Sequence, residues 1–500
     1  MSGKSCRWRA RQISKPDQLL KAITYTLRVT TTEHPRLTVL GAGYLGVTHA
    51  ACLAELGFDV LAVDTDGARI SALSAGDLPF FEPGLEPLLR RGLDSGRLRF
   101  TGSYAEVASI GDVHFVCVGT PQCADSDCAE LSQLDGCVAA LGPLLERPCL
   151  VVGKSTVPLG TAAALASKLA RLAPVRDAAE LAWNPEFLRE GHAVEDTLRP
   201  DRIVVGVQSR HAEGILRRVY AAPLSFGTPL FVTDLATAEL AKAAANSFLA
   251  TKISFINAMS EVCGSAGGDV AVLSEILGAD PRIGAAFLRP GLGFGGGCLP
   301  KDIRAFVASA AQLGVGEALA FLRQVDAINM RCRVRMVDMA RELAGGSLAG
   351  RAVTVLGVAF KPDSDDIRDS PALEVAKIIH DLGALVTVYD PVAMDKARQA
   401  CPELRYGGSL LGAASDADVL LLLTDWNEFR EADPEVLGKT VAQRKIADGR
   451  HVLDPGVWRR AGWDYRAPGR PSPSGGGPVQ AQRSVRKATP STLAKARDYS

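Results

Sequence analysis

Short apolar runs alternate with helical stretches through the first two fifths of the chain. The first run, LTVL, begins at Leu37. The runs that follow it are VLAVD (60–64), VHFVCVG (113–119), CLVVGKST (149–156) and RIVVGV (202–207). Strands that alternate with helices are typical of a parallel sheet covered by its crossover helices. The pattern therefore predicts an α/β domain.

Beyond residue 207 the pattern becomes helical. The stretch LATAELAKAAANSFLATKISFINAMSEVCGSAG (235–267) is dominated by alanine and larger apolar residues and contains no proline. A long helix that is apolar nearly all round must be buried on several sides, so it predicts a hinge between domains and a subunit interface. Strand patterns return at AVTVLGVAF (352–360), ALVTVYDP (384–391) and ADVLLLLT (417–424).

The predicted fold class is therefore α/β, with two Rossmann-like, doubly wound parallel-sheet domains joined by a long central helix and a helical middle domain. The terminal stretches lack the apolar content that folding requires. The predicted divisions are an extension (1–34), a first α/β domain (35–232), a central helical and dimerisation domain (233–330), a second α/β domain (331–470) and a flexible tail (471–500).

Composition narrows the classes of function. A chain of 500 residues is too long for one hydrophobic core, which indicates two or three domains. Its zero net charge gives no global attraction to nucleic acid or to a membrane surface. No apolar run approaches the roughly 20 residues that span a bilayer, and the basic first residues have no apolar segment behind them. Eleven cysteines without a CxxC pair favour reduced thiols in the cytoplasm over disulfides or a metal site.

A glycine fingerprint follows the first strand. Gly41, Gly43 and Gly46 have GxGxxG spacing, which allows a tight turn, close approach of a pyrophosphate and close packing of the next helix. Asp64, at the end of the second strand, can accept hydrogen bonds from ribose hydroxyls and repel a 2′-phosphate, which favours NAD over NADP. Arg69 could meet a 2′-phosphate, but while Asp64 is present we interpret it as a solvated arginine of a helix face.

The segment RPGLGFGGGCLPKDIRAF (289–306) places five glycines around one cysteine. Such a loop can wrap a ligand with backbone amides, and Cys298 stands where a nucleophile would be useful. A cysteine among apolar residues is also often inert packing. Lys301 could stabilise a thiolate, and Asp302 could orient a base or a water, although either could instead cap the following helix.

Several motifs together resemble the UDP-glucose/GDP-mannose dehydrogenase family. They are GFGGGCLPKD (293–302), NPEFLREG (184–191), KSTVP (154–158), VGTP (118–121), FFEPGLEPLL (80–89) and AFKPDSDDIRDSP (359–371). Their order and spacing hold from about residue 37 to residue 470. The closing DGRHVLDPGVWRRAGWDYRAPGR (448–470) is similar to the end of the bacterial members that oxidise UDP-glucose, so the expected substrate is UDP-glucose.

The resemblance implies a thioester mechanism. Cys298 would attack the C6 aldehyde formed by a first hydride transfer, and a second transfer would leave a thioester that water hydrolyses. Glu186 would be the general base for that water, and on a helical turn it would share a face with Glu190, a supporting acid. The remaining catalytic positions implied are Lys242 and Asn246, aimed at the reacting oxygen, with Asp302 and Thr156 handling the water.

The resemblance also implies the binding residues. Cofactor contacts are expected at Gly41, Gly43, Tyr44, Leu45, Gly46, Asp64, Arg69, Thr120, Thr156, Glu190, Lys301 and Arg368. Substrate contacts are expected at Glu186, Phe187, Leu188, Arg189, Lys242, Asn246, Arg282, Arg289, Phe294, Gly295 and Lys361, with Arg282 reaching across a homodimer interface formed by the central helix. Gly297 replaces the family's usual serine, which predicts a more flexible loop.

Other interpretations fit part of these observations. GDP-mannose or another UDP-hexose is the alternative substrate within the family. A two-electron β-hydroxy-acid dehydrogenase would share the first domain and a catalytic lysine, but it needs neither a nucleophilic cysteine nor a second α/β domain. A non-catalytic NAD-binding protein would have no reason to hold Lys242, Asn246, Cys298 and Asp302 together.

Overall fold

A computed structural model of the protein describes residues 34–471. The predicted extension (1–34) and tail (471–500) lie outside these residues, apart from positions 34 and 471 themselves. The described chain forms two compact units, the first made of residues 34–120 and 130–242 and the second of residues 121–129 and 243–471. The boundary falls inside one long helix, α11 (Leu235–Ala266), which matches the predicted central helix.

The first unit contains an eight-stranded sheet in the order β3-β2-β1-β4-β5-β6-β7-β8. Its strands are β1 (Leu37–Leu40), β2 (Val60–Val63), β3 (Leu98–Thr101), β4 (Val113–Val116), β5 (Cys149–Gly153), β6 (Ala179–Trp183), β7 (Ile203–Gly206) and β8 (Leu230–Thr233). The first six strands are parallel, whereas β7 meets β6 in antiparallel orientation at the pair Trp183↔Gly206. Strand β8 then runs parallel to β7.

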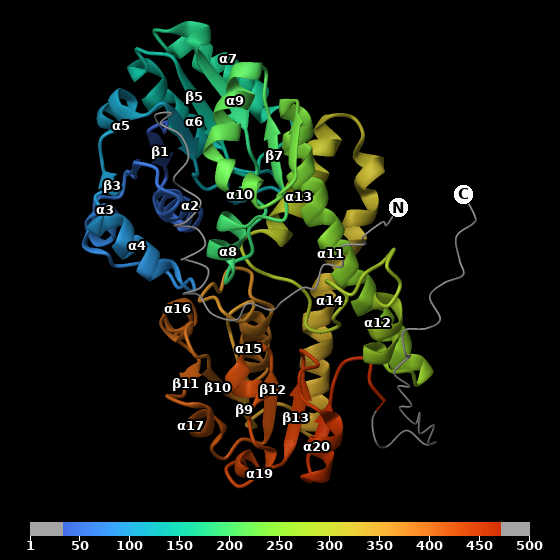
Figure 1. The fold of residues 1–500 in the computed structure, drawn as a ribbon. Helices are drawn as coiled ribbons and strands as arrows, with labels where there is room; N and C mark the ends of the chain where they lie inside the picture. The colour runs from blue at the N-terminus through green and yellow to red at the C-terminus, as the bar shows by residue number, and fades with distance from the viewer. Residues whose placement is uncertain (1–33, 472–500) are drawn as a thin grey trace, which may run out of the picture. The chain divides into compact units, whose positions relative to one another are not determined.

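Helices cover both faces of this sheet (Figure 1). They are α2 (Tyr44–Glu55), α3 (Gly67–Ala75), α4 (Leu85–Asp94), α5 (Tyr104–Ile110), α6 (Ser132–Leu141), α7 (Thr161–Leu172), α8 (Ala193–Leu198), α9 (Arg210–Val219) and α10 (Ala221–Ser225), with short 3-10 turns at Gly142–Leu144 and Arg176–Ala178. Alternate strand residues enter two separate cores, so Val39 packs with α2, α4 and α9, while Leu40 packs with α5, α6 and α7. The predicted doubly wound arrangement is confirmed.

The second unit contains a six-stranded parallel sheet in the order β11-β10-β9-β12-β13-β14. Its strands are β9 (Ala352–Leu356), β10 (Leu385–Tyr389), β11 (Arg405–Tyr406), β12 (Val419–Leu422), β13 (Lys445–Asp448) and β14 (Asp464–Arg466). The helices that accompany it are α15 (Pro371–Asp381), α16 (Met394–Ala400), α17 (Leu410–Ala414), α18 (Asn427–Arg430), α19 (Pro434–Leu437) and α20 (Pro455–Arg460). The second predicted α/β domain is thus confirmed.

The helical part of the second unit connects the nucleophile segment to this sheet. It comprises the greater part of α11 with α12 (Val270–Gly278), α13 (Leu299–Gln312), a 3-10 turn (Gly316–Leu319) and α14 (Ala320–Leu343). The first half of α14 packs Leu322 and Val325 with Ala250 of α11 and Ile303 of α13. Its second half enters the core of the sheet. One continuous helix therefore joins the two layers.

No helix within residues 34–471 is long and apolar enough to cross a membrane.

Candidate active site

The glycine turn between β1 and α2 has the geometry that the fingerprint predicts. Gly41 has φ +94°, and a Cβ on Gly46 would lie 1.8 Å from the carbonyl oxygen of Gly41. A Cβ on Gly43 would meet nothing within 4 Å, because this residue faces open space at the start of α2. The arrangement leaves backbone amides and a helix N-terminus accessible to an anion.

Asp64 holds this turn in place. Its Oδ2 accepts a 2.8 Å hydrogen bond from the backbone N–H of Ala42, and its Oδ1 accepts one of 3.0 Å from Asp66. Arg69 Nη1 lies 3.1 Å from Asp64 Oδ2. The arginine is thus an ion-pair partner of the carboxylate.

Glu82, a residue to which the sequence analysis gave no role, joins three segments of the first unit. Its buried carboxylate accepts a hydrogen bond from the Tyr44 hydroxyl and 2.7 Å bonds from the backbone N–H groups of Gly191 and Ala193. Burial and the neighbouring Glu82 and Glu190 raise the pKa of Tyr44 well above its ordinary value. Glu82 lies in the motif FFEPGLEPLL, so its position was visible in the sequence although its contacts were not.

The motif KSTVP forms the turn after β5. Thr120 Oγ1 donates a 2.7 Å hydrogen bond to the carbonyl of Thr156, which brings these two predicted cofactor contacts together. Glu239 of α11 accepts bonds of 2.7 and 2.6 Å from the backbone N–H groups of Gly160 and Ala162 at the start of α7. A carboxylate at a helix N-terminus is favoured by the unpaired amides and the helix dipole. The contact fixes the start of α11 beside the turn.

The segment NPEFLREG is not helical, so the prediction that Glu186 and Glu190 share a helical face is wrong. Three of its backbone N–H groups bond to side-chain carboxylates instead of to carbonyls four residues earlier. Leu188 donates to Glu186 Oε2 at 2.6 Å, and Arg189 donates to Asp196 Oδ2 at 2.8 Å. The spacing of two carboxylates gave no information about these competing acceptors.

Glu186 and Lys242 form an ion pair in the first unit. Lys242 Nζ lies 3.0 Å from Glu186 Oε1, and the two side chains are 5% and 14% exposed. The ring of Phe187 lies beneath both Lys242 Nζ, at 5.6 Å, and the Arg202 guanidinium, at 3.8 Å. Three predicted site residues are therefore in contact, with the charges of the pair largely shielded from water.

A second buried lysine lies behind this pair. Lys154 Nζ donates a 2.9 Å hydrogen bond to Asn184 Oδ1, an oxygen that also accepts from the Tyr220 hydroxyl. Burial lowers the pKa of Lys154 to about 8, with Glu186 acting in the opposite direction. Lys154, Asn184 and Tyr220 line one cavity with Glu186 and His49. The sequence analysis missed Lys154, although it begins the motif KSTVP.

In the second unit, Cys298 is the N-cap residue of α13. Its carbonyl accepts a 3.0 Å hydrogen bond from the backbone N–H of Asp302, and the residue is exposed. A helix N-terminus favours negative charge, as a cysteine nucleophile requires. Of the other nine described cysteines, seven are buried, and Cys123 and Cys128 are half-buried in a loop.

Asp302 is the buried centre of a polar cluster beside the nucleophile. It is 3% exposed, and its two carboxylate oxygens lie 2.6 Å from Lys301 Nζ and 2.6 Å from Asn246 Nδ2. Three residues that the resemblance implies are therefore in direct contact. The Lys301 ammonium is paired with Asp302. That Lys301 stabilises a Cys298 thiolate stays a prediction.

The glycine loop before Cys298 is tightly packed, and the expectation that Gly297 makes it more flexible stays a prediction. A Cβ on Gly295 would lie 2.2 Å from the carbonyl oxygen of Asp369, and one on Gly296, which has φ +84°, would lie 2.7 Å from the Phe360 ring. A Cβ on Gly297 would lie 2.4 Å from the guanidinium carbon of Arg368. The missing side chains allow the loop to pack against the AFKPDSDDIRDSP segment.

Four predicted binding-site cations, Arg289, Arg368, Lys361 and Arg282, lie at or near the surface of the second unit. Arg289 pairs with Asp425 at 3.2 Å, and Arg368 pairs with Asp366 at 2.6 Å. Lys361 Nζ lies 5.2 Å from the Phe360 ring. Arg282, whose side chain is 87% exposed, pairs with Asp280. Within residues 34–471, no group of three or more His, Cys, Asp or Glu side chains could hold a metal ion.

The glycine turn gives a matched test. Gly46→Ala should lower the free energy of unfolding by about 3 kcal/mol, because the new methyl group would overlap a backbone carbonyl. Gly43→Ala should leave stability unchanged and raise the dissociation constant for NAD, because its methyl group enters the space that a pyrophosphate would occupy. Thermal unfolding and NAD titration measure the two effects. Equal stability of the two variants would contradict this account of the turn.

Lys154 gives a second test. The folded chain releases the Lys154 proton near pH 8, while the unfolded chain holds it to about pH 10.4, so the stability contributed by this site should rise with pH between these values. The free energy of unfolding of the natural protein minus that of Lys154→Met should therefore increase from pH 8 to pH 10 and be level below pH 7. Chemical denaturation measures this difference in the free energy of unfolding, and Lys168→Met is the control for the lost charge. A difference that is level across the whole range would refute the assignment.

Sequence profiles of one family match three successive segments of the chain. The NAD binding domain of the UDP-glucose/GDP-mannose dehydrogenase family matches residues 35–223, its central domain residues 236–331 and its UDP binding domain residues 354–455. The first unit therefore contains an NAD-binding domain.

Individual relatives match over most of their length. A UDP-glucose 6-dehydrogenase of Pseudomonas aeruginosa is 40% identical over 446 residues, which cover 87% of this chain and 98% of the relative. A UDP-glucose 6-dehydrogenase of Bacillus subtilis is 36% identical over 441 residues, covering 88% and 94%. The solved structure of a UDP-glucose dehydrogenase from Pyrobaculum islandicum has a TM-score of 0.81 and 37% identity, covering 89% of this chain and all of that one. The chain thus belongs to the UDP-glucose/GDP-mannose dehydrogenase family.

Proposed function

We propose that the protein is a UDP-glucose 6-dehydrogenase that converts UDP-glucose to UDP-glucuronate with two NAD per sugar. The observation that carries the proposal is the exposed Cys298 at the start of α13, beside a buried Asp302 that Lys301 and Asn246 hold. The choice of UDP-glucose as the substrate rests on the relatives, which are named UDP-glucose 6-dehydrogenases and are 36–40% identical to this chain.

The cofactor fits the first unit. The open space at Gly43 and the amides at the start of α2 suit a pyrophosphate, and the Asp64 carboxylate suits ribose hydroxyls. NAD, when bound, accepts a hydride from C6 in each oxidation. The further proposed contacts to it are Gly41, Tyr44, Leu45, Gly46, Arg69, Thr120, Thr156, Glu190, Lys301 and Arg368.

The covalent steps belong to Cys298. The alcohol first loses a hydride and a proton to give an aldehyde, and the Cys298 sulfur then bonds to the aldehyde carbon to form a thiohemiacetal. Loss of a second hydride and a second proton leaves a thioester. Water attacks the thioester carbon, the carbon–sulfur bond breaks, and the thiol returns with release of the carboxylate. One sugar and one water thus yield two NADH.

The polar residues manage charge and protons in this sequence. The Lys242 ammonium stabilises the oxyanion of each step, because a cation in a site shielded from water interacts strongly with developing charge. Glu186, whose carboxylate is oriented by the Leu188 N–H, takes the proton of the attacking water. Asn246 and Asp302 hold that water or the C6 hydroxyl, with Thr156 as an additional donor.

The nucleotide of the substrate carries two phosphates, for which cations and planar donors are suited. In this proposal Arg289 and Lys361 bind it with Phe187, Leu188, Arg189, Phe294 and Gly295. Arg282 completes the site from the second subunit of a homodimer. Its largely exposed side chain supports that role.

A homodimer formed through α11 is part of the proposal. Phe248, Phe255 and Val262 are exposed and recur every seven residues, which places them on one stripe of α11. Exposed apolar patches of this kind often mark protein interfaces. The proposed domain division keeps α11 within the central domain (233–330), between the NAD-binding domain (35–232) and the UDP-sugar domain (331–470). The free thiols of the ten described cysteines support action in the reducing cytoplasm.

The reaction should give two NADH per UDP-glucose consumed, and the yield is measured by absorbance with UDP-glucose, GDP-mannose and UDP-N-acetylmannosamine as a panel. Cys298→Ser should lose overall turnover by about 100-fold or more, because an unactivated hydroxyl adds to the aldehyde and leaves the ester far less readily than a thiolate does. Cys332→Ser, at a buried thiol of α14, is the matched control and should retain activity. Full turnover by Cys298→Ser would overturn the mechanism.

A charge on the exposed stripe should separate the subunits. Phe255→Asp should lower both molar mass and activity, because it buries a carboxylate in the proposed interface and removes the partner's Arg282 from each site. Val436→Asp places the same charge at an exposed apolar position outside α11 and should lower neither molar mass nor activity. Light scattering beside the activity assay measures both, and a fully active monomer would refute the dimeric site.

A further inference from the structure

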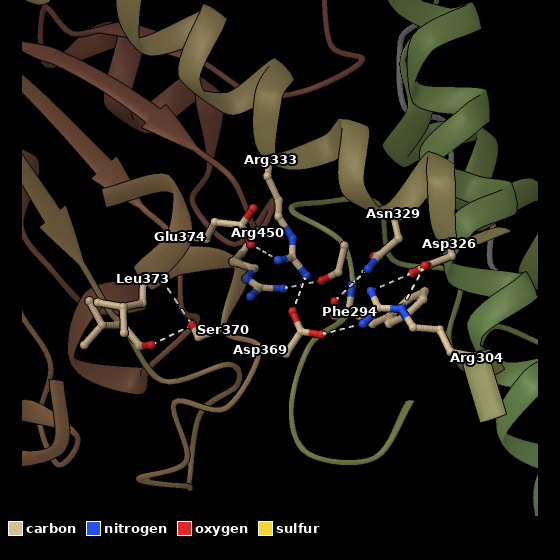
Figure 2. A network of polar contacts seen from close by, with 12 residues as sticks. Phe294, Arg304, Asp326, Asn329, Arg333, Asp369, Ser370, Leu373, Glu374 and Arg450 are labelled. Atoms are coloured by element: carbon tan, nitrogen blue, oxygen red, sulfur yellow. Dashed lines mark hydrogen bonds and ion pairs between the residues drawn. The ribbon is translucent and has the colours of Figure 1, made fainter. Parts of the chain in front are cut away.

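A polar stripe runs along α14 in the second unit. Asp326, Asn329 and Arg333 are spaced i, i+3 and i+7, so they lie on one side of the helix. Figure 2 shows Asn329 directed at Phe294, Arg333 at Asp369 and Glu374, and Asp326 at Arg304. Asn329 and Arg333 are each 1% exposed. Polar side chains are rarely buried so deeply unless they bond to particular partners.

Asn329 binds the nucleophile loop at its backbone. Its Oδ1 accepts a 2.7 Å hydrogen bond from the N–H of Phe294, and its Nδ2 donates a 3.0 Å bond to the carbonyl of the same residue. Gly293 has φ +91°, and a Cβ there would lie 2.3 Å from Asn329 Oδ1. The side-chain amide thus pairs with a peptide as a neighbouring strand would, four residues before Cys298.

Arg333 reaches the same loop through Asp369. Its Nη2 lies 2.8 Å from Asp369 Oδ1, and its Nη1 donates to Glu374. Asp369 has φ +45°, an uncommon conformation for a residue other than glycine. The carbonyl of Arg368, the residue before it, accepts a 3.0 Å hydrogen bond from the Gly296 N–H. Arg333 therefore stabilises the strained turn on which the glycines rest.

Asp326 holds the helix that follows the nucleophile. Its carboxylate lies 3.0 Å from Arg304 Nε, and Arg304 is on α13, six residues after Cys298. Arg304 Nη1 also approaches Asp369 Oδ2 at 3.9 Å. The three residues of the stripe thus bind the chain before Cys298, the loop packed against it and the helix after it.

We propose that this stripe of α14 positions the Cys298 nucleophile, with Asn329 as its central positioning residue; the part of the proposal that concerns turnover rests on the proposed function. No member of the stripe need touch the reacting atoms. Each fixes backbone that carries the sulfur, and a displacement of about 1 Å at a reacting atom can lower a rate by about 100-fold.

The test compares Asn329→Ala and Asn329→Asp with the natural enzyme. Asn329→Ala removes both bonds to Phe294, whereas Asn329→Asp keeps the acceptor for its N–H and loses the donor to its carbonyl. We expect kcat to fall about 10- to 100-fold in the alanine variant and less in the aspartate variant, with the KM for NAD unchanged. The rate of Cys298 alkylation by iodoacetamide, followed by peptide mass spectrometry, should fall about threefold or more as the sulfur leaves the helix N-terminus.

Val337→Ala is the matched control, since it creates a cavity in the sheet core eight residues farther along α14 and removes no hydrogen bond to Phe294. It should lower the melting temperature while leaving kcat and the alkylation rate as they are. Asn329 variants that behave like Val337→Ala would overturn the proposal. Because alkylation needs no sugar, an altered alkylation rate in a protein that does not oxidise UDP-glucose would support the positioning role and contradict only the proposed substrate. If the alanine variant does not fold, the aspartate variant decides.

Discussion

A carboxylate withdrawn from water needs several hydrogen-bond donors, and in this protein backbone amides supply most of them. Asp64 and Glu82 accept N–H groups of the cofactor turn and of the start of α8, and Glu239 accepts those at the start of α7. In the second unit Asp390 accepts N–H groups of Val358 and Ala359 just after β9, as Asp64 does just after β1. These acceptors fix the irregular segments in which the proposed site residues lie, so the chemistry depends on them as much as on the sheets.

The residues closest to the chemistry use side-chain donors. Asp302 is balanced by Lys301 and Asn246, and Glu186 by Lys242. Lys242 and Asn246 are four residues apart on one continuous helix, so the rise of the helix separates their Cα atoms by about 6 Å along its axis. The two groups proposed to act on one oxygen thus belong to neighbouring turns of one 32-residue helix.

The sequence predicted the features that depend on local pattern. The glycine turn with Asp64, the two α/β sheets and the long helix are all present, because period and turn chemistry suffice to specify them. It did not predict Lys154, Glu82 or Asn329, whose partners lie 30, 109 and 35 residues away in the chain. The prediction that Glu186 and Glu190 share a helical face was wrong. A spacing of four residues does not by itself specify a helix, and here side-chain carboxylates accept the hydrogen bonds of the backbone N–H groups.

The contact between Gly297 and Arg368 links two positions that stand 71 residues apart. The guanidinium occupies the volume into which a side chain at 297 would project, while the arginine is anchored on Asp366. A side chain at 297 would require the exposed Arg368 guanidinium to move aside. The effect of a substitution at 297 on the packing of this loop should therefore depend on which residue stands at 368.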